Sequence, residues 1–481
     1  MEIKEENFQW TNVRNQYIAY IAANLIFLNH GSVLGWNSPA MPQLSSENTP
    51  LSSGRLTNEQ ISWIGSISNI GALCGAFSFG YITSFLGCKR AMIFLAIPSI
   101  IFWTLIFFGR TYYHILLARF CGGWTGGGIQ SIVILFVSEI ANDNIRGRCG
   151  GISHVLRNFG ILIGYTLGAK LDYQYIPCIC VLFPITFAVV FAILPNTPRY
   201  YLRKGQPKRA ENALRFYKGY KGKNEQEMYK ELERLKVIAN EQKSDEKMKM
   251  SDICNRVAMK GLGISIALSI FSQMTAGYTI INYSVTIFQN SGTTIDPHVS
   301  SILLAVALIC GPLTATYLAD SLGRKRLNFI SLMGSAIGQL AVAFYRYLYV
   351  NGYDLSAFAW VPVFSLSFVL FISSAGIIPL TVVCSVEYIP SKIRTFGMSI
   401  ISCVLSGSGF ISMKLFPILL ESLDLYGTML IYGICCVTAS IFVHLVLKET
   451  SGKSLDNDID ISNDKNTNKC VCTLQGITSE K

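Results

Sequence analysis

The sequence predicts an all-α membrane protein with twelve transmembrane helices in two six-helix halves. Of the 481 residues, 51% are hydrophobic and only 14% are charged, whereas a soluble protein has about a quarter charged residues. The apolar residues form runs of roughly 20, the length that crosses a bilayer as a helix. A polar turn, LADSLGRKR at 318–326, lies between two such runs and has a diverged copy, GYITSFLGCKR at 80–90. This repetition indicates two similar halves.

The first half is expected at residues 17–194. A polar stretch, residues 1–16, precedes it, and its acidic start at Glu2, Glu5 and Glu6 is not typical of a cleavable signal peptide. We expect this stretch to be a cytoplasmic tail. The six predicted spans are 17–41, 61–83, 91–109, 112–138, 151–170 and 175–194.

The segment 195–257 is the longest polar stretch between apolar runs. In 208–217 and 226–235, apolar residues recur at helical spacing and opposite charges lie three or four residues apart. These patterns predict short amphipathic helices in a cytoplasmic linker. Two interpretations fit the segment: a solvated connection, or a latch between the halves.

The second half is expected at residues 258–447. A polar segment, 448–481, follows it and is predicted to be a cytoplasmic tail. The six predicted spans are 258–289, 298–319, 327–350, 357–385, 394–419 and 425–447.

The loop charges predict the orientation in the membrane. Basic residues gather in alternate loops, at Lys89–Arg90, Arg146–Arg148, Arg324–Arg326 and Lys392–Arg394, and in the central linker. The positive-inside rule therefore places both termini in the cytoplasm of a multi-pass protein, which we expect in the plasma membrane. These loops account for the net charge of +11, so we expect no nucleic-acid partner.

Several motifs, taken in order, point to one family. They are GWNSP at 35–39, RFCGG at 119–123, PNTPR at 195–199, EYIP at 387–390 and ETSGKSL at 449–455. With these motifs the chain resembles the sugar porter branch of the major facilitator superfamily over nearly its whole length, and most of all the insect trehalose transporter group.

The resemblance implies the major facilitator fold and a facilitative transporter of trehalose or a hexose that works by alternating access. The expected partners are a small-molecule sugar and the lipid bilayer, with no obligate protein partner. The chain has no nucleophile arrangement, metal-ligand set or phosphate-binding loop. We therefore expect neither an enzyme nor a cofactor or metal site.

Charged residues at the span ends are predicted to form a cytoplasmic gate. Glu139 and Glu387 each end a span, with a cation a few residues beyond. In the family, residues at such places hold the inside closed, and the ion pairs break when the inside opens. The alternative is that these charges only set topology. The predicted gate residues are Arg90, Arg119, Glu139, Arg146, Asp320, Arg324, Glu387 and Arg394.

The substrate site is predicted by resemblance near the seventh and fifth spans. Gln273 retains a family sugar contact, whereas Ser374, Val382 and Ser406 replace side chains that many hexose carriers have. The site residues implied are Gln273, Thr275, Tyr278, Asn282, Tyr283, His154 and Asn158.

Three basic residues leave alternatives open. His154 either binds substrate or is a histidine that is hydrogen-bonded within the bundle. Arg157 and Lys414 are unusual in a cavity for neutral sugars. Either they reach an interface, or the cavity accepts cations and an anionic substrate.

The first span bears on energy coupling. Proton-driven sugar porters have a carboxylate in its middle, where this chain has Ser32 with His30 nearby. Because a proton relay needs a titratable group in the membrane, downhill facilitation is the simpler mechanism. A proton-coupled symporter that uses His30, and a transport-poor sugar sensor or receptor derived from a carrier, are the two alternatives.

Overall fold

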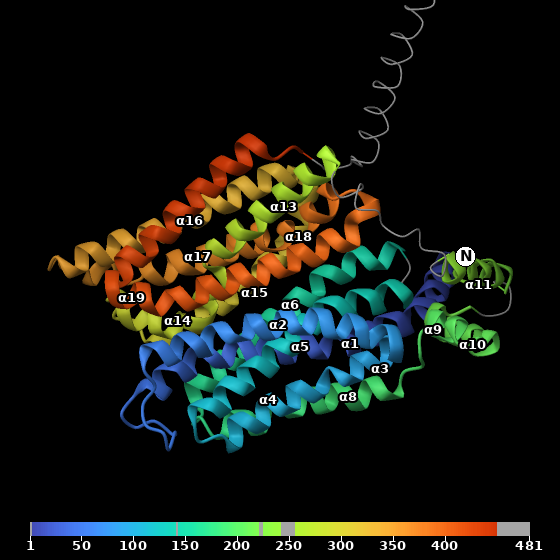
Figure 1. The fold of residues 1–481 in the computed structure, drawn as a ribbon, viewed down its shortest axis with the longest axis horizontal. Coiled ribbons are helices and arrows are strands. Elements are labelled where there is room, and N and C mark those ends of the chain that lie inside the picture. The colour runs from blue at the N-terminus through green and yellow to red at the C-terminus, as the bar shows by residue number, and fades with distance from the viewer. Residues whose placement is uncertain (1, 141–142, 221–224, 242–254, 450–481) are drawn as a thin grey trace, which may run out of the picture.

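The computed structural model describes residues 2–140, 143–220, 225–241 and 255–449 (Figure 1). Within these ranges the chain is helical apart from short connections, and no strand occurs.

The first half is built from helices whose breaks follow from proline. Pro98 cannot donate to the Phe94 carbonyl four residues earlier, and α3 ends at Phe94. Pro184 likewise cannot donate to the Cys180 carbonyl, and α7 ends at Cys180. The helices are α1 (Glu2–Ser45), α2 (Asn58–Leu86), α3 (Cys88–Phe94), α4 (Ala96–Phe108), α5 (Tyr112–Ile140), α6 (Asp143–Lys170), α7 (Tyr175–Cys180) and α8 (Leu182–Ile193).

Three linker helices lie together at one end of the molecule, here called the linker end (Figure 1). They are α9 (Pro198–Arg203), α10 (Pro207–Lys218) and α11 (Glu225–Glu241). Helices α10 and α11 occupy the two stretches for which the sequence predicts short helices. Tyr217 donates to the Pro195 carbonyl, and Asn15 of α1 donates to the Phe216 carbonyl at 2.8 Å. These bonds hold the linker helices against the first half; a latch between the halves stays a prediction.

The second half repeats this plan with two interrupted spans. Ala276, with φ of 59°, separates α13 from α14, and Gly376 separates α17 from α18. Asp424, with φ of 56°, divides the 53-residue α19 into two helices. The helices are α13 (Arg256–Met274), α14 (Gly277–Ser291), α15 (Pro297–Leu322), α16 (Arg324–Val350), α17 (Val361–Ala375), α18 (Ile377–Tyr388) and α19 (Arg394–Val446), with 3₁₀ turns at Ser356–Phe358 and Ser391–Ile393.

Ten helical segments of the described chain are long and apolar enough to cross a membrane. One of them is α19, which is two helices. α6 is also of spanning length, but it is more polar because it carries His154, Arg157 and Asn158. Counting α6 and the second helix of α19, the structure is consistent with the twelve predicted spans.

The two halves meet at the end opposite the linker helices, here called the far end. The side chain of Asn37 donates to the Asn282 carbonyl at 3.0 Å, and the hydroxyls of Ser38 and Ser284 are 2.8 Å apart. The Tyr165 hydroxyl donates to the carbonyl of Ile281. These hydrogen bonds join α1 and α6 to α14, so the far end is closed.

Candidate functional site

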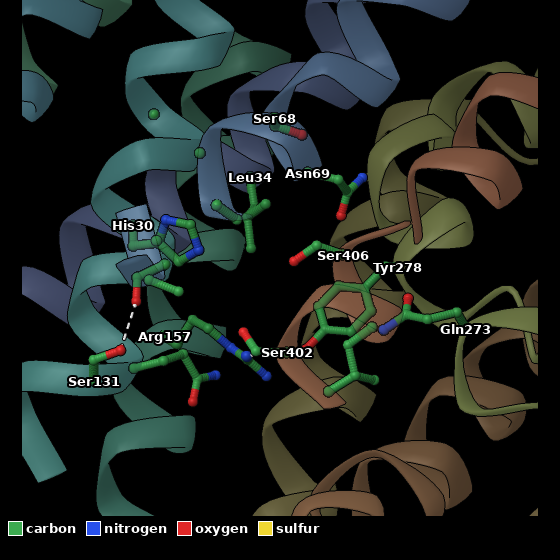
Figure 2. Close-up of a pocket in the computed structure, with 18 of the residues that line it drawn as sticks. His30, Leu34, Ser68, Asn69, Ser131, Arg157, Gln273, Tyr278, Ser402 and Ser406 are labelled. Carbon is green, nitrogen blue, oxygen red and sulfur yellow. Dashed lines mark hydrogen bonds between the residues drawn. The ribbon is translucent and has the colours of Figure 1, made fainter. Parts of the chain in front are cut away.

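A cavity of about 350 Å³ lies between the two halves, and its mostly apolar wall carries several polar side chains. Helices α1, α2, α5 and α6 form one wall, and α13, α14, α18 and α19 form the other (Figure 2). The lining continues toward the linker end through Ile134 in α5 and Met398 in α19. Its polar residues are His30, Ser68, Asn69, Arg119, Gln130, Ser131, Arg157, Gln273, Tyr278, Ser402 and Ser406.

The break between α13 and α14 positions two of these side chains. Gln273 lies in the last turn of α13, and Tyr278 lies in the first turn of α14. Between them the Thr275 carbonyl, which the interrupted helix leaves free, accepts a hydrogen bond of 2.6 Å from the Gln339 side chain. The broken span thus presents an amide and a phenol to the cavity without leaving this carbonyl unpaired.

Arg157 extends into the cavity from α6. Figure 2 shows its side chain directed toward Ser402 and Tyr278 of the opposite half. It is 8% exposed, and one of its terminal nitrogens donates to the Tyr278 hydroxyl at 3.2 Å. The guanidinium carbon lies 5.8 Å from the centre of the Tyr278 ring, and Nε is buried without a hydrogen-bond partner. Arg157 therefore joins the halves and keeps donor capacity for a ligand.

His30 faces the same cavity from α1. Its Nδ1 is buried and has no hydrogen-bond partner. The ring fits because Gly126 of α5 has no side chain at the point where a Cβ would meet it. The position of His30 keeps it available to a ligand or to a proton.

The structure divides the predicted substrate-binding residues into two groups. Gln273 and Tyr278 line the cavity. The other five do not: His154, Asn158, Thr275, Asn282 and Tyr283 are absent from its wall.

Four of these five residues hold the structure around the cavity. Asn158 donates to the Leu308 carbonyl at 2.7 Å, and Thr275 donates to the carbonyl of Ser272. Asn282 accepts from Arg119 at 3.1 Å. Tyr283 stacks on Phe416 with ring centres 4.9 Å apart and lines a second pocket, of about 290 Å³, at the far end. The sequence motif identified the right helices, but it did not identify the faces that turn toward the cavity.

The predicted gate residues of the second half lie together at the linker end. Arg324 and Glu387 form a partly buried ion pair at 3.4 Å. The Glu449 carboxylate accepts from the backbone N–H groups of Arg324 and Lys325, at 2.8 and 3.2 Å, and so caps α16. Arg394 begins α19 and donates to the Ile389 carbonyl.

The first half has a different arrangement at the equivalent place. Gly87 and Gly323 share the same backbone conformation, with φ of 79° and 81°, but Cys88 follows the first glycine where Arg324 follows the second. Glu139 lines a pocket with Arg199 and Arg203 of the linker instead, and one of its carboxylate oxygens is buried without a hydrogen-bond partner.

Three other predicted gate residues are accounted for as follows. Arg90 is exposed at the linker end. The side chains of Arg146 and Asp320 lie outside the described residues.

Arg119 is a correction to the predicted gate. It precedes Glu139 by 20 residues of the same helix, which corresponds to about 30 Å at 1.5 Å per residue. Arg119 is fully buried, and its Nε donates to the Ile64 carbonyl at 3.1 Å. It therefore supports the wall of the cavity near the far end and does not belong to the group at the linker end.

Comparison with known proteins identifies the family. The family model described as "Sugar (and other) transporter" matches residues 7–458. The chain belongs to this family. The resemblance inferred from the motifs is thereby confirmed, and the chain is a membrane transporter rather than an enzyme.

Curated relatives include facilitated trehalose transporters named Tret1. The one from Polypedilum vanderplanki is 29% identical over 446 residues, which are 92% of this chain and 87% of the relative. The one from Bombyx mori is 28% identical and covers 93% of this chain and 86% of the relative.

Solved structures confirm the major facilitator fold. The inward-open xylose transporter XylE from E. coli superimposes with a TM-score of 0.76 at 18% identity, over 92% of this chain and 98% of that one. A partially occluded inward-open form gives 0.73 at 18% identity, over 90% and 100%.

Proposed function

We propose that this protein is a facilitative sugar transporter of the plasma membrane that works by alternating access. The observation that carries the proposal is the cavity between the two halves, with polar side chains of both halves on its wall. Such a midplane site at the interface of two repeats is what a rocking carrier requires. The names of the relatives support trehalose, or a hexose, as the first substrates to test.

The closed far end supports the same mechanism. Its hydrogen bonds between α14 and the first half must break for the cavity to open there. In that state, charged residues at the linker end, including Arg324 and Glu387, are proposed to contact the first half and close the opposite side. The Arg324–Glu387 pair itself joins α16 to α18 within the second half and is present while the far end is closed. In this proposal the linker end and both termini are cytoplasmic, as the loop charges predict.

The lining of the cavity favours facilitation over proton coupling. Of the described residues on its wall, none is an aspartate or a glutamate. His30 is the side chain that would have to carry a proton instead. A proton-coupled carrier is therefore the alternative to be tested directly.

The test is uptake of labelled glucose and trehalose into proteoliposomes, with and without a proton gradient, by the natural protein and a Gln273→Ala variant. Gln174→Ala, which removes an exposed amide between α6 and α7, is the matched control. We expect saturable uptake that ignores the gradient, is reduced at least about tenfold in Gln273→Ala, and is unchanged in the control.

Two results would contradict this proposal. Uptake that requires the proton gradient would establish the symporter. Sugar-induced thermal stabilisation of the purified protein without any flux would instead favour the sensor or receptor.

A further inference from the structure

The wall of the cavity carries positive charge without an acid opposite it. Arg119 and Arg157 both line it, and the part of the wall that the structure describes contains no carboxylate. A buried charge without a partner is costly, and it is more costly at membrane depth. The two arginines differ in how many of their N–H donors the protein pairs.

Arg119 is satisfied by the protein itself. Its Nε donates to the Ile64 carbonyl, and one terminal nitrogen donates to the Val33 carbonyl at 3.4 Å. The other terminal nitrogen donates to Ser68 at 3.4 Å and to Asn282 at 3.1 Å. With every nitrogen used, Arg119 is a supporting residue of the wall.

Arg157 is not satisfied in this way. A guanidinium has five N–H donors in a fixed fork, and here one of them is paired, with the neutral hydroxyl of Tyr278. Nε is buried without a partner, although nine-tenths of the side chain is removed from solvent. The planar fork suits a carboxylate or a phosphate, which it can bind through two parallel hydrogen bonds.

The surroundings of Arg157 suit the remainder of a small polyol. Figure 2 shows Asn69, Ser406 and Gln273 facing the same space on the side away from Arg157. These hydroxyl and amide groups can both donate to and accept from sugar hydroxyls. At about 350 Å³ the cavity is near the small end of the range for ligand sites, roughly 300–1,000 Å³, which fits one sugar ring better than two.

We infer that the preferred substrate is a monosaccharide derivative with one anionic group, a carboxylate or a phosphate, and that Arg157 binds this group. The inference rests on the proposed function, since it specifies the solute that the proposed carrier moves. It also predicts that transport is electrogenic, because a facilitated anion crosses the membrane with its charge.

The experiment compares glucuronate and glucose 6-phosphate with glucose and trehalose in proteoliposomes. The proteins are the natural chain, Arg157→Gln and Arg157→Lys, with Lys170→Gln, which removes an exposed cation from the end of the same helix, as the control. Uptake is measured with and without an inside-positive potential set by a potassium gradient and valinomycin.

We expect one of the two anions to be taken up faster than either neutral sugar and to be accelerated by the inside-positive potential. Arg157→Gln lowers the ratio of anion to glucose uptake by about tenfold or more, as loss of a charged hydrogen bond implies. Arg157→Lys keeps part of the preference, because the charge remains and the fork is lost. Which anion is favoured distinguishes a carboxylate site from a phosphate site.

The inference about the anion and the proposed function fail in different ways. If neutral sugars are preferred and Arg157→Gln leaves the ratio unchanged, the proposed carrier stands and the anionic substrate is rejected. If no solute shows flux, the proposed function fails, and thermal unfolding of the purified proteins then decides the binding question. Stabilisation by an anion that is lost in Arg157→Gln retains the anion site, and no difference between the two proteins rejects it.

Discussion

At the scale of single residues, Glu449 shows how one carboxylate can secure a helix end. It follows the last membrane helix, and its oxygens accept from the first two N–H groups of α16. These groups have no partner within the helix, and the N-terminal end of a helix attracts negative charge. Glu449 therefore couples the end of the second half to the turn after Gly323.

Replacing Glu449 with alanine is expected to destabilise the protein. Loss of a charged N-terminal cap costs about 1–2 kcal/mol, and the measurement is the unfolding midpoint of the purified protein in urea. Glu47→Ala is the control, since the Glu47–Arg55 pair, 3.8 Å apart, is largely exposed and such pairs contribute little. Equal midpoints for the two variants would show that the cap does not contribute to stability.

The residue scale also shows what the sequence left undetermined at the site. Motifs identified Gln273 and Tyr278, which line the cavity. In α6, however, His154, Arg157 and Asn158 stand at positions i, i+3 and i+4 and so share one broad face of the helix, and of the three only Arg157 lines the cavity. The rotation of α6 depends on its packing, so the sequence did not show that Arg157 alone of these three faces the cavity.

At the scale of helices, small residues set how closely the helices of the first half approach. A Cβ on Gly75 of α2 would meet backbone atoms of Trp124 and Gly128 in α5. A Cβ on Gly31 of α1 would meet the Arg157 carbonyl of α6 in the same way. Small residues at such faces let membrane helices pack closely.

Gly75→Ala is expected to destabilise the first half, and Gly80→Ala is the matched control on the same helix. Alanine at 75 forces α2 from α5, at a cost of about 1–3 kcal/mol for overpacking. A Cβ at Gly80 has nothing within 4 Å, so alanine there gains about 0.5–1 kcal/mol of helix propensity. Thermal unfolding followed by tryptophan fluorescence should order the proteins as Gly80→Ala, natural chain, Gly75→Ala. The reverse order would contradict the packing of α2 against α5.

The predictability of the helices has a physical basis. Spans were visible in the sequence because the membrane requires long apolar runs with all backbone groups bonded internally. A break inside a span was not visible: Ala276, within the predicted span 258–289, adopts positive φ, which alanine does not favour. The break at Asp424 falls between the predicted spans 394–419 and 425–447. Arg119, by contrast, could have been excluded from the gate with the sequence alone. The rise of a helix over the 20 residues between Arg119 and Glu139 already places them about 30 Å apart.

At the scale of the molecule, the far end determines which side of the cavity is open. Ser38 of α1 contacts the Ser284 hydroxyl and accepts from the N–H of Val285 at 2.9 Å, and Tyr165 of α6 donates to the carbonyl of Ile281. Alternating access requires that the state with the far end closed be more stable than the state with it open by only a few kcal/mol. Hydrogen bonds of about 0.5–1.5 kcal/mol each are therefore strong enough to change the fraction of molecules whose far end is open.

The double change Ser38→Ala and Tyr165→Phe is expected to open the far end more often. A reporter cysteine replaces Thr286, which lines the pocket there beside Tyr283, after the exposed Cys74, Cys178 and Cys310 are changed to serine. Because up to three hydrogen bonds are lost, a membrane-impermeant thiol reagent added outside cells should label the reporter about tenfold faster or more.

The control for this labelling is Tyr173→Phe, because the Tyr173 hydroxyl is buried in the first half without a hydrogen-bond partner. It changes the same chemical group without removing a bond between the halves, so the labelling rate should not move. If the double change also leaves the rate unaltered, the contacts of α14 with α1 and α6 do not close the far end. If labelling rises equally in the control, loosening of the first half rather than opening between the halves is the cause. Faster labelling in the double variant alone ties the closure to these contacts, which the cavity needs if it is to face one side of the membrane at a time.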